Sequence, residues 1–338
     1  MTTISLLLPT RGRKEHLERL FDSLLEKTFD LSRIEIILCI DEDDFESQSL
    51  TFPPVFHIRK LIGPRSTMGT YNTKCLSAST GNIVILFNDD IVVRTPNWDR
   101  IIESFDENHQ DKIYLAYVND LFKKEKVGSF PILSRRACEI LTDPFPADYK
   151  GEHIDYHLFD IFKRLETAGY PRIHYFEDVV FEHMHFSQGK AQVDQTYLDR
   201  KMYADDQVFI AYSSFRRRSA ERLKEAIEGE SLSMPLEKPT VVNVADGRKY
   251  LKDLYDAFLK DGSFRFGGAP SCFSGFCGVF WQKMENCFGS RSCIRLCADN
   301  GREKEKIPSI EVWSRCQRDW VKNKELTVFP RKKQVLLF

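Results

Sequence analysis

The stretch that decides the fold runs Ile83-Val84-Ile85-Leu86-Phe87-Asn88-Asp89-Asp90. Five large apolar residues in a row predict a short strand that is buried on both faces of a sheet. An amide and two carboxylates follow directly, so the strand ends in polar side chains. In open α/β sheets, ligands bind beyond the carboxyl ends of the strands. The stretch therefore predicts a buried strand with a polar site at its end.

The two adjacent carboxylates, Asp89 and Asp90, favour a divalent cation. Neighbouring negative charges repel each other unless a cation or solvent relieves them. Magnesium in proteins is usually held by one or two carboxylates together with substrate phosphates. The alternative is a plain strand-to-loop turn, because Asn and Asp favour turns in any case. Both interpretations follow from these residues alone.

Strand and helix patterns alternate on both sides of this stretch. Apolar residues at three- and four-residue spacing, such as Leu17, Leu20 and Leu24, indicate helices, and short apolar runs indicate strands. This alternation favours an α/β fold, in which a mostly parallel sheet carries helices on both faces. The predicted strands are 4–9 (ended by Pro9), 34–40, 56–62, 83–87, 113–118 and 179–185, and further helices are predicted at 68–79, 98–105, 158–168 and 217–228.

The composition is that of a globular protein with a sizeable core. The chain has 338 residues, of which 42% are hydrophobic and 29% charged. A net charge of −1 provides no field that would favour nucleic acid or an acidic membrane surface. The first residues lack the basic region of a signal peptide, and no stretch approaches the roughly 20 apolar residues of a membrane span. Nine cysteines without a CxxC pair complete the expectation of a reduced, cytoplasmic protein.

A cluster of Gly, Ser and Pro at 229–240 indicates a domain boundary. Residues 1–230 are expected to form the first domain, and 231–338 a second domain or extension rich in Cys, Phe and Trp. Its six cysteines favour an aromatic core with free thiols over a zinc site, because their spacing matches no zinc knuckle. This region could cover an acceptor cleft, mediate self-association or dock a partner, and the oligomeric state is not determined. The tail 330–338, basic and then apolar, fits either a final packed strand or a peripheral contact with a membrane.

Polar residues also follow the first two predicted strands. The segment 9–13 (Pro9-Thr10-Arg11-Gly12-Arg13) ends the first strand, and Asp41 ends the second. An arginine offers fork-like donors to a phosphate or a base edge, and Gly12 allows a close backbone approach. The Asp41 carboxylate can accept hydrogen bonds from a nucleobase or a ribose. Alone, 9–13 also fits a capped helix start with solvent-facing arginines, and the acids from Asp41 also fit a solvated loop, but three polar strand ends at one sheet edge favour a shared site.

Taken in order, these segments resemble the inverting nucleotide-sugar glycosyltransferases of family 2, which have the GT-A fold. The resemblance covers roughly residues 3–215. It implies a GT-A-type fold for residues 1–230 and the transfer of a sugar from a nucleotide-diphosphate donor to a hydroxyl acceptor, with inversion. The segments that carry it are Ser5-Leu6-Leu7-Leu8-Pro9-Thr10-Arg11, Asp41, the stretch 81–90, Gly151-Glu152-His153-Ile154-Asp155-Tyr156 and Glu182-His183-Met184-His185.

The resemblance also implies roles for single residues. Asn88-Asp89-Asp90 matches the family's DxD motif with Asn in place of the first acid, so Asp90 would be the chief metal ligand and Asp89 a metal or ribose contact. His183 or His185 would complete a site for Mn²⁺ or Mg²⁺, and both point the same way along the predicted strand, so the choice between them stays open. The nucleotide-sugar-binding residues would be Pro9, Thr10, Arg11, Arg13, Asp41, Asn72, Asn88 and Asp89.

The acceptor-site motif departs from the family pattern. Many relatives have a Glu-Asp pair where this chain has Glu152-His153, with Asp155 two residues further on. The predicted base is Asp155, then Glu152, with His153 as the third candidate. A helix start enriched in acids for its dipole is the alternative interpretation of these residues.

The implied mechanism is a single displacement. A divalent cation neutralises the leaving diphosphate, and a base removes the proton of the acceptor hydroxyl. The expected partners are a nucleotide-diphospho-sugar donor and a glycan or lipid-linked acceptor, without nucleic acid. Two other functions stay open. One is a sugar-nucleotide nucleotidyltransferase, which would need a Gly-rich phosphate loop that segment 9–13 matches poorly. The other is a non-catalytic scaffold that binds nucleotide-sugars or glycans. The sequence does not identify the sugar, the nucleotide, the acceptor or the linkage.

Overall fold

The computed structural model describes residues 3–126, 128–151, 153–192, 195 and 205–241. These residues belong to one compact unit, Met1–Gly268. Glu152 lies outside the described residues, as do the cysteine-rich segment and the tail of the predicted second domain. No helix within the described ranges has the length and the apolar character needed to cross a membrane.

An eight-stranded sheet organises the described residues. In spatial order its strands are β3 (His57–Gly63), β2 (Ile34–Asp41), β1 (Ile4–Thr10), β4 (Ile83–Leu86), β7 (Ile132–Ser134), β6 (Leu115–Asn119), β8 (Ile173–His183) and β5 (Ile91–Val93). The first four strands are parallel. β7 is antiparallel to β4 and β6, β8 is parallel to β6, and β5 is antiparallel to β8. The predicted α/β class with a mostly parallel sheet is confirmed.

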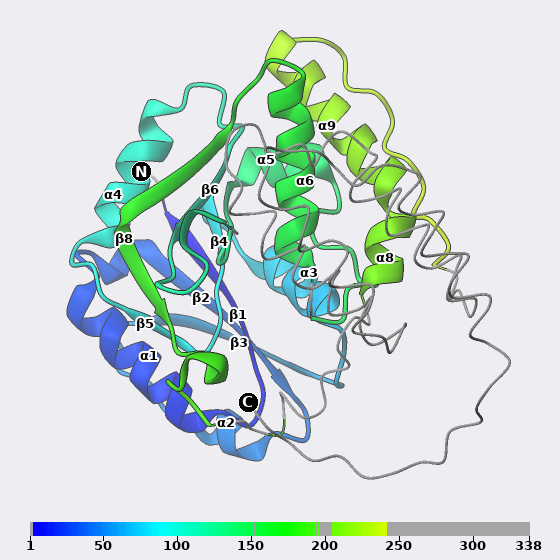
Figure 1. Ribbon diagram of the computed structural model, residues 1–338. Helices are drawn as coiled ribbons and strands as arrows, with labels where there is room; N and C mark the ends of the chain where they lie inside the picture. The colour runs from blue at the N-terminus through cyan, green and yellow to red at the C-terminus, as the bar shows by residue number, and fades with distance from the viewer. Residues whose placement is uncertain (1–2, 127, 152, 193–194, 196–204, 242–338) are drawn as a thin grey trace, which may run out of the picture. The chain divides into compact units, whose positions relative to one another are not determined.

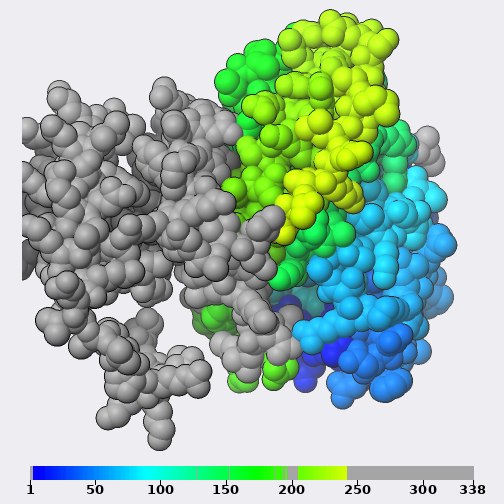
Figure 2. Space-filling model, turned by 90° about the vertical axis from the view of Figure 1, so that its right-hand side faces the viewer, coloured from blue at the N-terminus to red at the C-terminus, as the bar shows by residue number. Residues whose placement is uncertain are grey.

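Helices flank the sheet on both sides (Figure 1). One face carries α1 (Lys14–Lys27) and α4 (Trp98–Asn108), and the other carries α3 (Met68–Ala78), α5 (Arg135–Leu141) and α6 (Ile154–Thr167). α9 (Ser213–Glu228) packs against α5 and α6, and its yellow-green surface is visible in Figure 2. The short helices are α2 (Phe45–Ser49) and α8 (Asp206–Ala211), with 3-10 turns η1 (Leu31–Arg33), η2 (Lys124–Lys126) and η3 (Phe186–Gln188).

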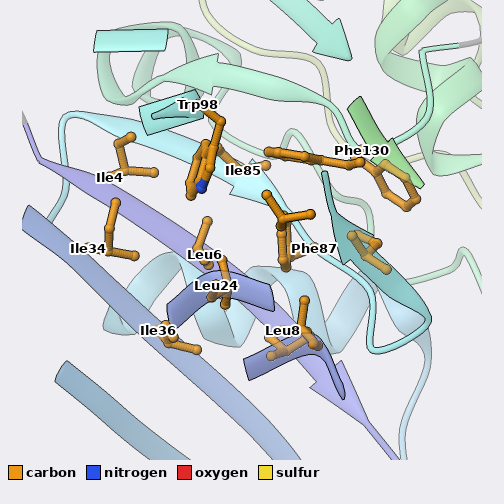
Figure 3. Close-up of a cluster of buried hydrophobic side chains, with 14 of the residues drawn as sticks. Ile4, Leu6, Leu8, Leu24, Ile34, Ile36, Ile85, Phe87, Trp98 and Phe130 are labelled. Atoms are coloured by element: carbon orange, nitrogen blue, oxygen red, sulfur yellow. The ribbon is translucent and has the colours of Figure 1, made fainter. Parts of the chain in front are cut away.

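The core explains why the strands are so apolar. Alternate residues of a strand point to opposite faces, and Ile4, Leu6 and Leu8 of β1 are fully buried against the α1–α4 side. Figure 3 shows them facing Leu24 of α1 and Trp98 of α4. Burying one such side chain contributes about 1.5–3 kcal/mol relative to leaving it exposed. This packing holds the strands in register and so fixes where their carboxyl ends lie.

Pro9 does not end the first strand, which runs one residue further to Thr10. The register explains this difference. β4 pairs with β1 only from Ile4 to Leu7, while β2 continues alongside β1 as far as Thr10. Pro9 therefore lies where β1 has a strand neighbour on one side only, and proline is tolerated at such positions.

Sequence patterns missed the shortest elements and the starts of three longer ones, β8, α6 and α9, the last of which begins at Ser213 rather than 217. β5 and β7 have three residues each, which is too few for a periodicity to show. β8 begins at Ile173 rather than 179, because its first six residues, Ile173-His174-Tyr175-Phe176-Glu177-Asp178, do not alternate strictly between apolar and polar, and they join the sheet by parallel pairing with β6. α6 begins at Ile154, four residues before the predicted start.

Candidate active site

The Asp pair lies between the end of β4 and the start of β5. Asn88 is exposed, whereas Asp89 and Asp90 are both buried, each with 4% of its surface accessible. The backbone carbonyl of Asp90 accepts a hydrogen bond of 2.8 Å from the N–H of Met184, and Ile91 lies opposite His183 in the β5–β8 pair. The pairing of β5 with β8 therefore fixes the backbone at Asp90 and places His183 beside it.

Asp89 is held by the end of β1. Thr10 Oγ1 donates a hydrogen bond of 2.8 Å to Asp89 Oδ2, and Arg13 Nη1 donates one of 2.8 Å to Asp89 Oδ1. Burial raises the pKa of the Asp89 carboxyl to about 6, and the Arg13 charge works against that rise. Both oxygens of Asp89 thus have protein donors, which makes it a carboxylate that organises the site from within.

Asp90 faces an imidazole and the same guanidinium. Its Oδ2 lies 3.4 Å from Nε2 of His183 and 3.7 Å from Nη1 of Arg13. The His183 ring packs edge-on against Phe130, at 5.3 Å between centroids. An oxygen donor and a nitrogen donor therefore stand side by side at the strand end.

The two candidate histidines have different surroundings. β8 ends at His183, so His185 lies beyond the strand and the predicted alternation stops one step short of it. His185 stacks on Phe122 with ring centroids 5.3 Å apart and planes 22° apart. Val179 and Phe181, which precede His183 by four and two residues in β8, are buried.

A divalent cation at this edge of the sheet would need ligand atoms from a bound substrate in addition to protein side chains. Within the described ranges, no group of three or more His, Cys, Asp or Glu side chains is placed to hold a metal ion. Asp90 and His183 are two suitable donors, and Asp89 is turned toward Thr10 and Arg13. Since magnesium-type sites commonly combine one or two protein ligands with substrate phosphates, the donor set is compatible with a metal–diphosphate complex.

A second cluster of charged residues lies at the end of β2. Arg11 Nη1 donates a hydrogen bond of 2.7 Å to Asp41 Oδ2, and its Nη2 donates one of 2.8 Å to Asp43. The hydroxyl of Tyr71, on α3, donates to the other oxygen of Asp41. The hydrogen bond to Asp43 raises the pKa of Arg11, and burial followed by the contact with Asp41 raises the pKa of Tyr71. Asp41 is 1% exposed, so this network sets its orientation.

The turn between these two clusters depends on glycine. Gly12 has a φ of 62°, a conformation that glycine adopts without steric cost. Its N–H donates a hydrogen bond of 2.7 Å to Asp44, whose other oxygen accepts from Ser47 at the start of α2. The loops after β1 and β2 are thereby joined. Asn72 is buried on α3, one residue beyond Tyr71.

The acceptor-motif residues lie at the start of α6. His153 precedes the helix, with its Nε2 2.9 Å from Asp206 Oδ1, and Asp155 lies in the first turn. Burial raises the pKa of Asp155, against the effects of the Tyr156 N–H and of the nearby His153 and Lys123. A carboxyl with a raised pKa is a reasonable proton acceptor near neutral pH.

A loop built on Asp120 connects the two sides of the site. Its Oδ1 accepts hydrogen bonds of 2.7–2.9 Å from the N–H groups of Phe122, Lys123 and Lys124, and its carbonyl accepts one of 3.1 Å from His183. Phe122 contacts the His183 ring at 6.1 Å, while the charge of Lys123 acts on Asp155. The start of α6 and the end of β8 therefore face the same loop.

Sequence reasoning found the strand-end residues but missed several of their partners. Asp43, Tyr71 and Asp120 were not expected in the site, and neither was Asp206. An acidic residue at a helix start is the only local signal that could have indicated Asp206, and it is common in structural helices too. Of the predicted residues, the structure brings Thr10, Arg13, Asp89, Asp90 and His183 into one cluster, and joins Arg11 to Asp41 in another.

Comparisons with known proteins give likenesses in structure only. No protein-family model matches the chain, and no curated protein matches it in sequence. A mannosyltransferase from Pyrobaculum calidifontis, solved with GDP-Man and Mn²⁺, is 13% identical over 95% of this chain and 85% of its own, with a TM-score of 0.45. S. aureus TarS 1–349 with UDP-GlcNAc is 13% identical over 82% and 92%, with a TM-score of 0.41. Glucosyl-3-phosphoglycerate synthase from Mycobacterium tuberculosis, with Mn²⁺ and UDP-glucose, is 16% identical over 63% and 78%, with a TM-score of 0.42.

Proposed function

We propose that this chain is a glycosyltransferase of the GT-A type, which moves a sugar from a nucleotide-diphosphate donor to a hydroxyl acceptor with inversion. The observation that carries the proposal is the convergence of polar groups from three strand ends. Thr10, at the end of β1, and Arg13, beyond it, hydrogen-bond to Asp89 after β4, and Arg11 hydrogen-bonds to Asp41 at the end of β2. Ligands of parallel sheets bind at this position.

The two clusters have different tasks in this proposal. The Arg11–Asp41–Tyr71 cluster contacts the nucleoside, because it combines fork-like donors with a carboxylate acceptor. Asp90 and His183 hold the divalent cation, Mn²⁺ or Mg²⁺, together with the donor diphosphate. When bound, the cation supplies Lewis acidity to the leaving diphosphate. His183 is preferred to His185 because its Nε2 lies 3.4 Å from Asp90.

The chain's own residues orient the donor and remove a proton. Arg13 and Thr10 keep Asp89 fixed, and this in turn keeps the adjacent Asp90 in its place at the start of β5. A base at the start of α6 takes the proton of the acceptor hydroxyl. The acceptor oxygen then bonds to the anomeric carbon while the bond to the diphosphate breaks, and the electron pair leaves with the diphosphate. One displacement of this kind inverts the anomeric centre.

The test is a screen of nucleotide-sugar donors that measures release of the nucleoside diphosphate with Mn²⁺ or Mg²⁺ present. We expect one donor class to be turned over and Asp90→Ala to lose both turnover and metal-dependent nucleotide binding. Glu107→Ala removes an exposed carboxylate on α4 and serves as the matched control. Undiminished turnover by Asp90→Ala would contradict the assignment. Metal-dependent nucleotide binding without turnover of any donor would favour the scaffold function instead.

A further inference from the structure

The imidazole of His153 is paired with a buried carboxylate from a distant helix. Its Nε2 lies 2.9 Å from Oδ1 of Asp206, in the first turn of α8. The Asp206 side chain is 1% exposed, and that of His153 is 17% exposed. The pair thus has a buried end at the carboxylate and a partly accessible end at the imidazole.

The position of His153 is not explained by helix capping. As the residue before α6, it makes no side-chain hydrogen bond to the helix, whereas Ser, Thr, Asp or Asn would do so. Its backbone has a φ of 58°, in the left-handed region that costs free energy for a residue other than glycine. Conformations of this kind persist where the surroundings impose them, often at functional sites.

The carboxylate decides which nitrogen of the ring carries the proton. An ionised carboxylate only accepts hydrogen bonds, so the nitrogen facing Asp206 is the N–H donor. The neutral ring then has its lone pair on Nδ1, for which no hydrogen bond is found among the described residues. The ring is also packed edge-on against Phe209 and Tyr156, at 5.8 and 5.5 Å between centroids. His153 is therefore oriented as a proton acceptor through Nδ1.

The segment that bears His153 is fixed to the same helix start. The neighbouring carboxylate, Asp205, accepts hydrogen bonds from the backbone N–H groups of Lys150 at 2.9 Å and Gly151 at 3.0 Å. Asp205 thus holds the backbone before α6, while Asp206 holds the imidazole. Asp205 therefore has a structural role and Asp206 orients the ring. A substitution of Asp205 is thus a matched control for one of Asp206.

The loop that contains Phe122 and Lys123 links the surroundings of His153 to those of His183. His153 and Lys123 both act on the carboxyl of Asp155, and Phe122, next to Lys123, contacts the ring of His183. Neighbouring residues of this loop therefore act on the start of α6 and on the end of β8.

We propose that His153 is the base of the transfer reaction and that Asp206 is its positioning residue. This inference rests on the proposed glycosyltransferase function. In the reaction, the acceptor O–H gives its proton to Nδ1 of His153 as the oxygen bonds to the anomeric carbon. The bond between that carbon and the diphosphate oxygen breaks, and the nucleoside diphosphate leaves with the electron pair. Asp206 stabilises the imidazolium that forms, through the hydrogen bond at Nε2.

The experiment compares His153→Gln, Asp206→Asn, Asp206→Glu, Asp205→Asn and Asp155→Asn in the full chain, using the donor found in the screen. We expect His153→Gln and Asp206→Asn each to lower kcat by about 10²-fold or more, with the KM of the donor and the metal-dependent affinity for its nucleoside diphosphate nearly unchanged. The double variant His153→Gln/Asp206→Asn should have a kcat only slightly lower than that of either single variant, because the two residues act as a unit. Asp206→Glu, which keeps the carboxylate, should recover part of the activity.

A spectroscopic measurement separates positioning from a structural role. In ¹⁵N-histidine spectra, His153 of the wild type should show the tautomer protonated at Nε2, and Asp206→Asn should shift the ring toward a mixture. Asp205→Asn should lower thermal stability but leave the tautomer and kcat nearly as they are. Wild-type kcat in Asp206→Asn, or activity lost in Asp155→Asn but kept in His153→Gln, would overturn the inference. If the wild type turned over no donor and bound no nucleotide, the proposed function itself would fall as well.

Discussion

Arg13 is the residue that ties the candidate site together. Its guanidinium lies 2.8 Å from Asp89 and 3.7 Å from Asp90, and its side chain is only 9% exposed. Three charged side chains in such a buried place are strongly interdependent, because removal of one partner leaves the others desolvated. The burial that raises the pKa of Asp89 to about 6 acts against the attraction of Arg13. The ionised form of the Asp pair therefore depends on this arginine.

We expect Arg13→Gln to lower the free energy of unfolding by about 3 kcal/mol, because removal of one partner from a buried ion pair leaves an uncompensated buried charge. The loss should be larger at pH 8 than at pH 6. Without Arg13, the pKa of Asp89 rises further, so at pH 6 the carboxyl can take up a proton, while at pH 8 it is driven toward the charged form. Urea unfolding at the two pH values measures both effects.

Arg217→Gln is the control for this substitution, because Arg217 is exposed on α9. It should change the unfolding free energy by less than about 0.5 kcal/mol at either pH. Equal stability of Arg13→Gln and the wild type would show that the Asp pair does not need the guanidinium.

Among the elements, α6 links the site to the interior of the helical layer. It starts at the left-handed His153, and four residues later the buried His157 contacts Tyr149, with Nδ1 3.0 Å from the tyrosine hydroxyl. One turn further, Asp160 forms a fully buried ion pair with Arg216 of α9, at 2.5 Å. Burial, and then the charge of Arg216, lower the pKa of His157 well below its usual range. The helix that presents the proposed base is thus anchored by polar groups that have little access to water.

The lowered pKa of His157 predicts a specific pH dependence. Below about pH 6.5 the unfolded chain protonates this histidine and the folded chain does not, so folding becomes less favourable by up to about 1.4 kcal/mol per pH unit. Protonation of Asp89 makes folding more favourable as the pH falls, because its raised pKa lets the folded state take up a proton near pH 6. The effect of His157 is therefore measured as the difference in unfolding free energy between a variant and the wild type.

We expect His157→Gln to be less stable than the wild type at pH 7.5, with a smaller difference at pH 5.5. Chemical unfolding at both pH values tests this. His57→Gln, at the exposed first residue of β3, should leave the pH dependence as it is. A difference between His157→Gln and the wild type that is the same at both pH values would contradict the buried neutral state of His157.

On the scale of the whole molecule, the site is assembled from segments far apart in the chain. The ends of β1, β2 and β4, the β5–β8 pair and the start of α6 all contribute groups, and each is positioned by the packing of the sheet and its helices. In the described part of the chain no three His, Cys, Asp or Glu side chains gather to hold a metal ion, and Asp90 and His183 form a pair 3.4 Å apart. Metal and nucleotide should therefore bind as one complex.

We expect Mn²⁺ alone, and UDP or GDP alone, to raise the melting temperature only slightly. The correct nucleoside diphosphate with Mn²⁺ should raise it much more, since a ligand at 100 times its Kd stabilises the folded state by about 2.7 kcal/mol. EDTA should abolish the combined effect. Asp90→Ala should lose this synergy, whereas strong stabilisation by Mn²⁺ alone would indicate a site built from protein ligands only.

The part of the fold and site that was predictable depends on local patterns. The apolar runs of β1, β2 and β4 report burial directly, because a strand covered on both faces must be apolar along its length. The polar residues that follow these runs could therefore be assigned to one edge of a parallel sheet. β5 and β7 left no such signal, and the start of β8 lacks the regular alternation that would have revealed its full length.

The sequence by itself determined the α/β class and the edge at which Thr10, Asp41, Asp89 and Asp90 gather. Only the tertiary structure decided which side chains meet there. Arg13 contacts Asp89, His183 rather than His185 lies next to Asp90, and Asp206 contacts His153 across more than fifty positions. Burial of apolar runs is imposed residue by residue, whereas contacts between distant polar groups depend on strand order and helix packing, which no local pattern encodes.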